Sequence, residues 1–399
     1  MSDYLEHKTY ELTCVSPMHI GSGETLKKYE YLYDNAKHVV YFPNKTKLLA
    51  LLQKYNLFEE YLAYVNDQCQ LTQNNLFSWL RQKRINEREI ISASTRKAVA
   101  PSCISVSKGQ RNMKGNINDL VTAITLPDGR LYIPGSSLKG VLRTGIIYGL
   151  LKKQPVLTES YEKQIEDILA KKPRKYELIR EMNNIEKSLE DKLLNILNIN
   201  TKNGSLKSVL RGLKVSDTIP AEKITSVIIQ KKDSLLDKHG RISKDPKPMP
   251  LVRECIPSES KFRLQITMDK KMMAELGIKS IEEIIAYTKE YTAAVLKELQ
   301  KGFNKNKNDR FYNDLFKEAE MADFFIGGGT GFLTKTIWLA LFANRRTDIV
   351  RSLLDIIIIP KNHCLGIKDR FISPRSLKLA EVDGDYRLMG MCQIRELKS

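Results

Sequence analysis

The sequence of 399 residues contains no long hydrophobic run. Its most apolar stretch is Ile356–Ile359, whereas a helix needs about 20 apolar residues to span a bilayer. The segment Met1–Glu6 has neither the basic start nor the apolar centre of a signal peptide. We therefore expect a cytoplasmic chain with no membrane partner, in which Ile356–Ile359 forms a buried strand.

Cysteine is scarce and follows no metal-binding spacing. The six cysteines are scattered along the chain, and neither C-x-x-C nor H-E-x-x-H occurs. His363 and Cys364 are adjacent, and neighbouring side chains rarely point at the same ion. Scattered cysteines in a long chain are typical of reduced thiols. We therefore expect no metal site and no cofactor.

Acidic residues are too few to balance the basic ones. Lys and Arg number 65 against 47 Asp and Glu, which gives a net charge of +18. The excess is local: segment 81–114 has nine basic and two acidic residues, and segment 361–380 has five and one. A local excess favours a binding surface for a polyanion such as a nucleic acid, and a solvated basic surface is the alternative.

Hydrophobic periodicity predicts a mixed α and β chain with helical insertions. The segment 10–15 alternates like a strand, and segments 29–33 and 39–42 flank a turn as in a hairpin. Segment 91–118 is polar and basic, and we expect a long loop that is mobile until a ligand arrives. Helices are expected over 45–80, after Gly135, over 159–197 with a break at Pro173, and over 280–325. Further strands are expected at 130–133, 214–216, 225–230 and 262–267, with an extended connection at 244–250 and closing strands up to Ile394.

The first of three anion-binding motifs follows the first strand, at Pro17–Gly23. Gly21, Ser22 and Gly23 would let backbone N–H groups approach a phosphate closely. His19 could donate to that phosphate or act as a base. The alternative is a simple turn with a half-buried histidine.

The second motif, Ile133–Arg143, opens a helix. Ser136 or Ser137 would cap it, and Lys139 and Arg143 lie four residues apart on one face. A helix N-terminus with hydroxyls and cations suits an anion. Val141 stands where a P-loop needs lysine, which excludes nucleotide hydrolysis of that kind. The alternative is a capped surface helix.

The third motif is the glycine-rich segment Gly327–Gly331, with Lys335 four residues beyond it. Its backbone could cradle phosphates, but it lacks the spacing of a dinucleotide-binding fingerprint. The alternative is a tight turn before a buried helix.

In this order along the chain, the three motifs resemble the RAMP superfamily, whose members are RNA-binding subunits of CRISPR systems. The resemblance runs in patches from Tyr10 to Arg395, and Ile133–Arg143 is its most specific part. It implies an α+β fold with a ferredoxin-like (RRM-like) RAMP core and helical insertions. The implied division is a first part of the core at 1–150 with a helical and basic-loop insertion at 45–118, a helical insertion at 151–205, and a second part of the core at 206–399 that carries helices and the glycine-rich loop.

The resemblance also implies a function. It is most specific for a non-catalytic RNA-binding subunit of a type III-A CRISPR (Csm) effector complex, which serves antiviral defence. Such a subunit caps the backbone at the 3′ side of the guide RNA (crRNA) and takes part in crRNA maturation. The implied partners are the crRNA, the other Csm subunits, especially the backbone RAMP subunit, and host nucleases, with no small-molecule substrate. The expected RNA-binding residues, from the motifs and the basic segment, are His19, Gly21, Ser22, Gly23, Arg96, Lys97, Ser136, Ser137, Lys139, Arg143, Gly327, Gly328, Gly329, Gly331 and Lys335.

Two alternatives stay open at this point. The chain could be a metal-independent crRNA-processing endoribonuclease with His19 as general base, or a neighbouring backbone RAMP subunit. In the related backbone subunit an aspartate soon after the His-Ile-Gly segment cuts target RNA. Here Asp34 is interpreted as a hairpin turn residue, so we expect no catalytic residue. Aromatic pairs that would read bases are not evident, which favours recognition of backbone and shape.

Overall fold

The computed structural model describes residues 4–67, 75–100, 117, 119–198, 204–236, 241–242, 246–303, 309–342, 346–357 and 371–398. Most of the expected loop at 91–118 and part of the basic segment 361–380 therefore lie outside the described residues.

The centre of the molecule is an antiparallel sheet with the strand order β12-β15-β1-β11-β7. Helix α6 (Gly135–Lys153) comes between β1 and β7 in the chain, and α11 (Ile281–Phe303) comes between β11 and β15. The succession β1-α6-β7-β11-α11-β15 with the sheet order β15-β1-β11-β7 is a ferredoxin-like topology, as expected. The strands of this sheet are β1 (Leu5–Cys14), β7 (Leu213–Val215), β8 (Ile219–Pro220), β11 (Lys261–Asp269), β12 (Phe324–Phe325) and β15 (Met391–Glu396).

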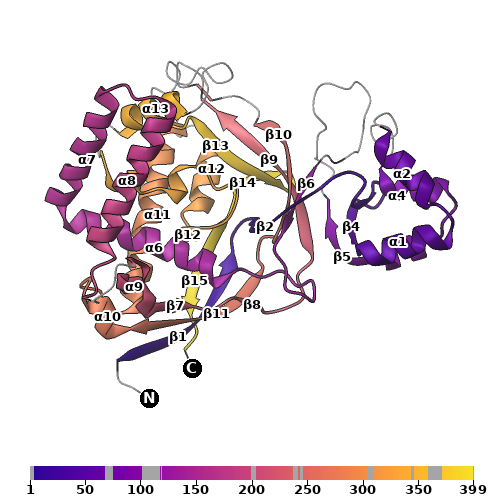
Figure 1. The fold of residues 1–399 in the computed structure, drawn as a ribbon, viewed down its shortest axis with the longest axis horizontal. Helices are drawn as coiled ribbons and strands as arrows, with labels where there is room; N and C mark the ends of the chain where they lie inside the picture. The colour runs from indigo at the N-terminus through magenta and orange to yellow at the C-terminus, as the bar shows by residue number, and fades with distance from the viewer. Residues whose placement is uncertain are drawn as a thin grey trace.

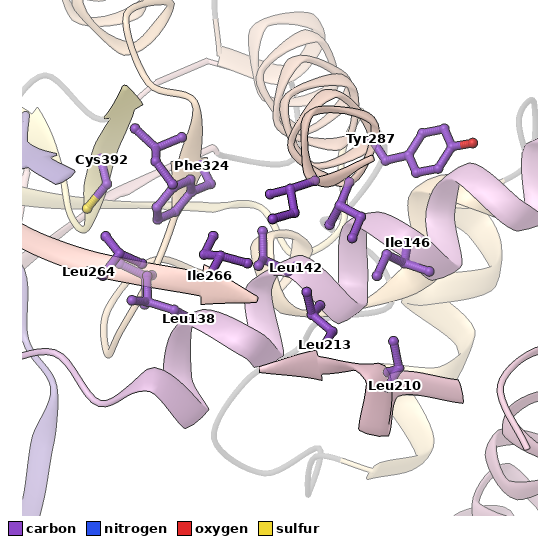
Figure 2. Packing of buried hydrophobic residues seen from close by; sticks show 14 of the residues in the cluster. Leu138, Leu142, Ile146, Leu210, Leu213, Leu264, Ile266, Tyr287, Phe324 and Cys392 are labelled. Atoms are coloured by element: carbon purple, nitrogen blue, oxygen red, sulfur yellow. The ribbon is translucent and has the colours of Figure 1, made fainter. Parts of the chain in front are cut away.

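The apolar side chains on one face of the strands pack against an apolar stripe on α6. Leu264 and Ile266 of β11 are buried on the sheet face that Leu138 and Leu142 of α6 cover (Figure 2). Each such side chain contributes about 1.5–3 kcal/mol when fully buried. Helix α11 crosses close to α6 at Gly145, where a Cβ atom would lie 2.7 Å from the Cα of Thr288. The close helix crossing therefore requires glycine.

A second sheet has the order β2-β6-β10-β9-β5-β4-β3, and β13 pairs with β9 and β14. Segment Ser94–Val99 forms β5, which corrects the expectation of a loop there: its backbone pairs with β4 and with β9, two partners that local composition does not reveal. The strands of this sheet are β2 (Gly21–Leu26), β3 (Leu32–Asp34), β4 (Val39–Pro43), β5 (Ser94–Val99), β6 (Leu120–Ala123), β9 (Ser226–Leu235), β10 (Lys247–Cys255), β13 (Ser376–Val382) and β14 (Asp385–Leu388).

The remaining helices cover the two sides of the molecule. A lobe of short helices lies at one side, and α7 and α8 lie at the other (Figure 1). The lobe consists of α1 (Lys45–Lys54), α2 (Phe58–Asn66), α4 (Leu76–Gln82) and α5 (Glu87–Ser92). The other helices are α7 (Pro155–Ala170), α8 (Lys175–Leu193), α9 (Gly204–Lys207), α10 (Lys270–Ala274), α12 (Arg310–Ala319) and α13 (Arg346–Ile357), with short 3₁₀ helices η1 (Val209–Gly212), η2 (Leu333–Lys335) and η3 (Ile337–Ala340).

Local patterns were right for the helices and wrong for two short strands. The break at Pro173 separates α7 from α8, as expected. Segment 130–133 contributes only an isolated bridge between Leu131 and Thr125. Ile356 and Ile357 form the end of α13 and not a strand, and residues 358 and 359 lie outside the described residues. Among the described helices, none is long and apolar enough to cross a membrane.

Candidate nucleic-acid interface

The three sequence motifs, which lie more than 300 residues apart at the extremes, meet in one open hollow of about 340 Å³. The hollow lies between the first turns of α6 and the Gly-rich loop, Gly327–Gly331. No acidic residue is among its described lining, which consists of His19, Ile20, Gly21, Ser137, Gly140, Val141, Thr144, Phe325, Ile326, Gly327, Gly328, Thr334 and Lys335. We call this site the motif hollow.

The Gly-rich loop lies directly on the backbone of His19. The N–H of Gly328 donates to the carbonyl oxygen of His19 at 2.7 Å, and the two residues form a β-bridge. Gly327 has φ +89°, and a Cβ atom there would overlap the same carbonyl oxygen. At Gly328 a Cβ atom would lie 2.9 Å from Cδ2 of the His19 ring. Glycine is therefore needed for this close approach.

The His19 ring is buried, with 4% of its surface exposed, and held in one orientation. Its Nδ1 lies 2.7 Å from the carbonyl oxygen of Glu254. A carbonyl only accepts, so Nδ1 carries the proton in the neutral ring and Nε2 keeps a lone pair. Burial is the main cause that lowers the pKa of His19; the hydrogen bond to Glu254 opposes it, and the nearby charges of Arg253 and Lys335 lower it further. The ring is therefore neutral at neutral pH.

Two cations, Lys335 and Arg253, lie at or beside the motif hollow. Burial, and then the charge of Arg253, lower the pKa of the Lys335 amine. The Nε and Nη1 atoms of Arg253 are buried and have no hydrogen-bond acceptor in the described part of the chain. Sequence reasoning missed Arg253, because a basic residue in a strand carries no signal until its neighbours are known.

Arg96 holds the framework of the site instead of lining it. Its guanidinium donates to both carboxylate oxygens of the fully buried Glu254, at 3.0 and 2.8 Å, and lies 4.2 Å from the ring centre of Phe42. Glu254 also accepts from the Ser226 hydroxyl and the Ala123 N–H. Arg96 thus neutralises the residue whose carbonyl fixes His19.

Of the remaining expected residues, Lys97 is exposed on β5 and Ser22 and Gly23 lie on β2, all outside the lining of the motif hollow. The Ser22 hydroxyl is 2.6 Å from that of Thr122. Ser22, Gly23 and Lys97 thus have no described contact with the other two motifs, and their role in RNA binding stays a prediction.

The start of α6 differs from the sequence-based expectation. The helix begins at Gly135 with Pro134 at the N-cap position, so neither Ser136 nor Ser137 is its cap. The Gly135 N–H donates to the carboxylate of Asp217 at 2.8 Å. An acidic side chain of the protein therefore already satisfies part of the positive end of this helix.

Lys139 and Arg143 are not among the residues that line the motif hollow, although Arg143 and Lys335 both line a neighbouring cavity of about 330 Å³. The Lys139 amine donates to the carbonyl of Leu210 at 2.7 Å, and Arg143 forms an ion pair with Glu190 of α8. Both cations thus have partners inside the protein. Their contact with RNA stays a prediction.

Asp34 has the structural role that the sequence predicted. It is buried at the end of β3 and accepts from the N–H groups of Ala36 (3.1 Å) and Lys37 (3.2 Å), which closes the hairpin. In the described ranges no group of three or more His, Cys, Asp or Glu side chains could hold a metal ion.

Comparison with known proteins places the chain in a family. A CRISPR system Cms protein Csm5 from Streptococcus thermophilus is 26% identical, over 84% of this chain and 81% of that protein. One from Mycobacterium tuberculosis (strain ATCC 25618 / H37Rv) is 25% identical, over 99% and 98%.

Two solved structures share the fold. One, from a Csm-crRNA-target RNA ternary complex of a type III-A CRISPR-Cas system, has a TM-score of 0.64 at 16% identity and covers 98% of this chain and 100% of that chain. The crystal structure of T. onnurineus Csm5 has a TM-score of 0.56 at 17% identity, with 96% and 99% covered. The family model of the RAMP superfamily matches residues 11–333, and the chain therefore belongs to this superfamily.

Proposed function

We propose that the chain is the RNA-binding end subunit of a type III-A CRISPR (Csm) effector complex. In this role it caps the RAMP backbone at the 3′ side of the crRNA and takes part in crRNA maturation. The observation that carries the proposal is the meeting of all three family motifs in one open hollow, whose described lining contains no acidic residue. Similarity to Csm5 proteins over most of the chain supports the same assembly.

The chemistry of the motif hollow suits a phosphodiester. The Lys335 amine and the Arg253 guanidinium supply positive charge near the Gly-rich loop, and a phosphate would supply the acceptor oxygens that Arg253 lacks among the described residues. Gly21, Gly140 and Gly328 leave room for a sugar-phosphate backbone. Contacts of this kind position RNA without reading its sequence, which fits a subunit that accepts many guides.

The structure also offers one observation for the endoribonuclease alternative. His19 is neutral, and its Nε2 keeps a lone pair that could take a proton from a ribose hydroxyl. The ring is nearly inaccessible, however, and its other nitrogen is bonded to the Glu254 carbonyl. We therefore propose that His19 shapes the motif hollow and does not cut RNA, and that host nucleases trim the crRNA.

Copurification tests the assembly. The operon that encodes this chain is expressed, the complex is isolated, and the RNA crosslinked to each subunit is sequenced. We expect crRNA in the complex, with crosslinks of this chain near its 3′ end. Crosslinks in the middle of the guide would favour a backbone position, and a complex that lacks both RNA and this chain would overturn the proposal.

A cleavage assay tests the non-catalytic role. End-labelled crRNA precursor is incubated with purified wild type and with His19→Ala, in EDTA and in magnesium. We expect intact RNA in every lane. Cleavage by wild type that disappears in His19→Ala, with RNA binding retained, would replace this proposal with the endoribonuclease. Equal cleavage by both proteins identifies a contaminating nuclease and leaves His19 non-catalytic.

A further inference from the structure

Next to the Gly-rich loop, lysine and arginine side chains from three strands lie on one face of the second sheet. Lys231 and Asp233 lie two residues apart on β9, so their side chains leave the same face of the strand. Arg253 of β10 is the cross-strand partner of Ile229, and Lys378 of β13 is the partner of Asp233, which places both on that face. We call Lys231, Arg253, Lys378 and Asp233 the basic face.

The basic face holds three cations and one carboxylate. The carboxylate of Asp233 is shared by the amines of Lys378 at 2.7 Å and Lys231 at 3.3 Å. Arg253 is left with two buried N–H-bearing nitrogens that find no acceptor in the described residues. Buried donors without acceptors are costly, and such groups are commonly satisfied by a ligand or by water. Burial, together with the charges of Lys378 and Arg253, lowers the pKa of Lys231.

The Gly-rich loop contacts both His19 of the motif hollow and Arg253 of the basic face. A Cβ atom at Gly329 would lie 2.8 Å from Nη1 of Arg253, and one at Gly328 would lie 3.7 Å from its Cζ. Further along, a Cβ atom at Gly331 would lie 3.9 Å from Cγ of Lys378. A second cavity of about 520 Å³ opens there, and Asp233, Gly331 and Lys378 are among its lining residues.

We propose that the basic face is a second phosphate-binding site. A single-stranded RNA backbone leaves the motif hollow, crosses the Gly-rich loop and contacts Arg253 on the basic face. The inference rests on the proposed function and adds to it a path for the RNA. The ligand is the phosphodiester, which would accept from Arg253 and relieve the repulsion among the three cations. The small loop residues let the backbone pass close to the protein.

The test is the salt dependence of RNA binding by the full chain. Fluorescence anisotropy gives the Kd for a labelled single-stranded RNA across a series of salt concentrations, for wild type, Arg253→Met, Lys231→Met and Lys232→Met. Lys232 is the matched control, because it is the next residue on β9, points to the opposite face and pairs with Glu381. Each lost phosphate contact should lower the slope of log K against log salt by about 0.7.

We expect reduced slopes for Arg253→Met and Lys231→Met, and the wild-type slope for Lys232→Met. Arg253→Lys, which keeps the charge, should restore most of the slope, and melting curves show that each variant is folded. Wild-type slopes in folded Arg253→Met and Lys231→Met would overturn the second site while leaving the proposed function intact. Wild type that binds RNA without salt dependence would overturn the proposed function itself.

Discussion

Single glycines decide whether the Gly-rich loop can lie on His19. Gly327 and Gly384 have nearly the same backbone angle, with φ of +89° and +90°, but different surroundings. At Gly384, in the turn between β13 and β14, an added Cβ atom meets nothing within 4 Å. At Gly327 the same atom overlaps the carbonyl oxygen of His19. The two positions therefore separate the cost of the backbone angle from the cost of the contact.

We predict that Gly327→Ala destabilises the protein more than Gly384→Ala. Alanine at a positive φ costs about 1–2 kcal/mol, and overpacking adds about 1–3 kcal/mol. Gly384→Ala should show only the first cost and Gly327→Ala both. Chemical denaturation with both variants measures the difference. Equal losses would mean that the loop moves away from His19 at little cost.

The buried neutral imidazole of His19 predicts a dependence of stability on pH. The pKa of His19 is lowered in the folded protein, chiefly by burial, so the unfolded chain binds the proton more tightly. This contribution to stability is complete above the unfolded pKa of about 6.5 and is lost as pH falls through the lower folded pKa. His19→Asn, whose side-chain amide can still donate to the Glu254 carbonyl, should flatten the dependence below pH 6.5. Melting temperatures from pH 8 to 5 test this, and parallel curves for the two proteins would contradict it.

At the scale of elements, the sequence predicted what local periodicity controls. The helix from Gly135, the hairpin closed by Asp34 and the strand expected at 262–267 all formed where expected, because each depends on neighbours in sequence. The strand β5 did not follow from its sequence, because its partners β4 and β9 supply the pairing. In the same way, Arg253 and the cap from Asp217 depend on residues far along the chain. Motif recognition found most of the motif hollow, but not which side of α6 faces it.

Lys335 and the two cations of α6 should differ in RNA binding. Lys335 lines the motif hollow, whereas Lys139 and Arg143 lie outside its lining and contact Leu210 and Glu190. We predict that Lys335→Met lowers the salt slope by about 0.7, and that Lys139→Met with Arg143→Met leaves it near the wild-type value. The partly exposed ion pair of Arg143 with Glu190 contributes about 1 kcal/mol, so the double variant should stay folded. A large loss of RNA affinity in the double variant would contradict this prediction and would mean that Lys139 and Arg143 contact RNA.

At the scale of the whole molecule, the fold combines a continuous core with a lobe that has its own. The core around α6 and β11 joins residues from Tyr10 to Ile394, so both ends of the chain must be in place to complete it. In the described part of the chain, the buried cluster of the α1–α5 lobe is formed by residues between 29 and 93. Figure 1 shows this lobe at the edge of the molecule, where β4 and β5 connect it to the second sheet. Such a lobe can open without the rest of the fold.

We therefore predict that a cavity in the lobe loosens the lobe alone. Leu52→Ala and Leu264→Ala each remove a buried leucine, which costs about 2–5 kcal/mol at its site. Hydrogen exchange followed by mass spectrometry should show faster exchange in peptides from 45–92 for Leu52→Ala, with β1 and β11 as protected as in wild type. Leu264→Ala should speed exchange in β1, β11 and α6 together, because these elements share one cluster. Faster exchange across the whole chain in Leu52→Ala would mean that the lobe and the ferredoxin-like core open as one unit. In that case the contacts through β4 and β5 would couple the lobe to the core more strongly than their short pairing implies.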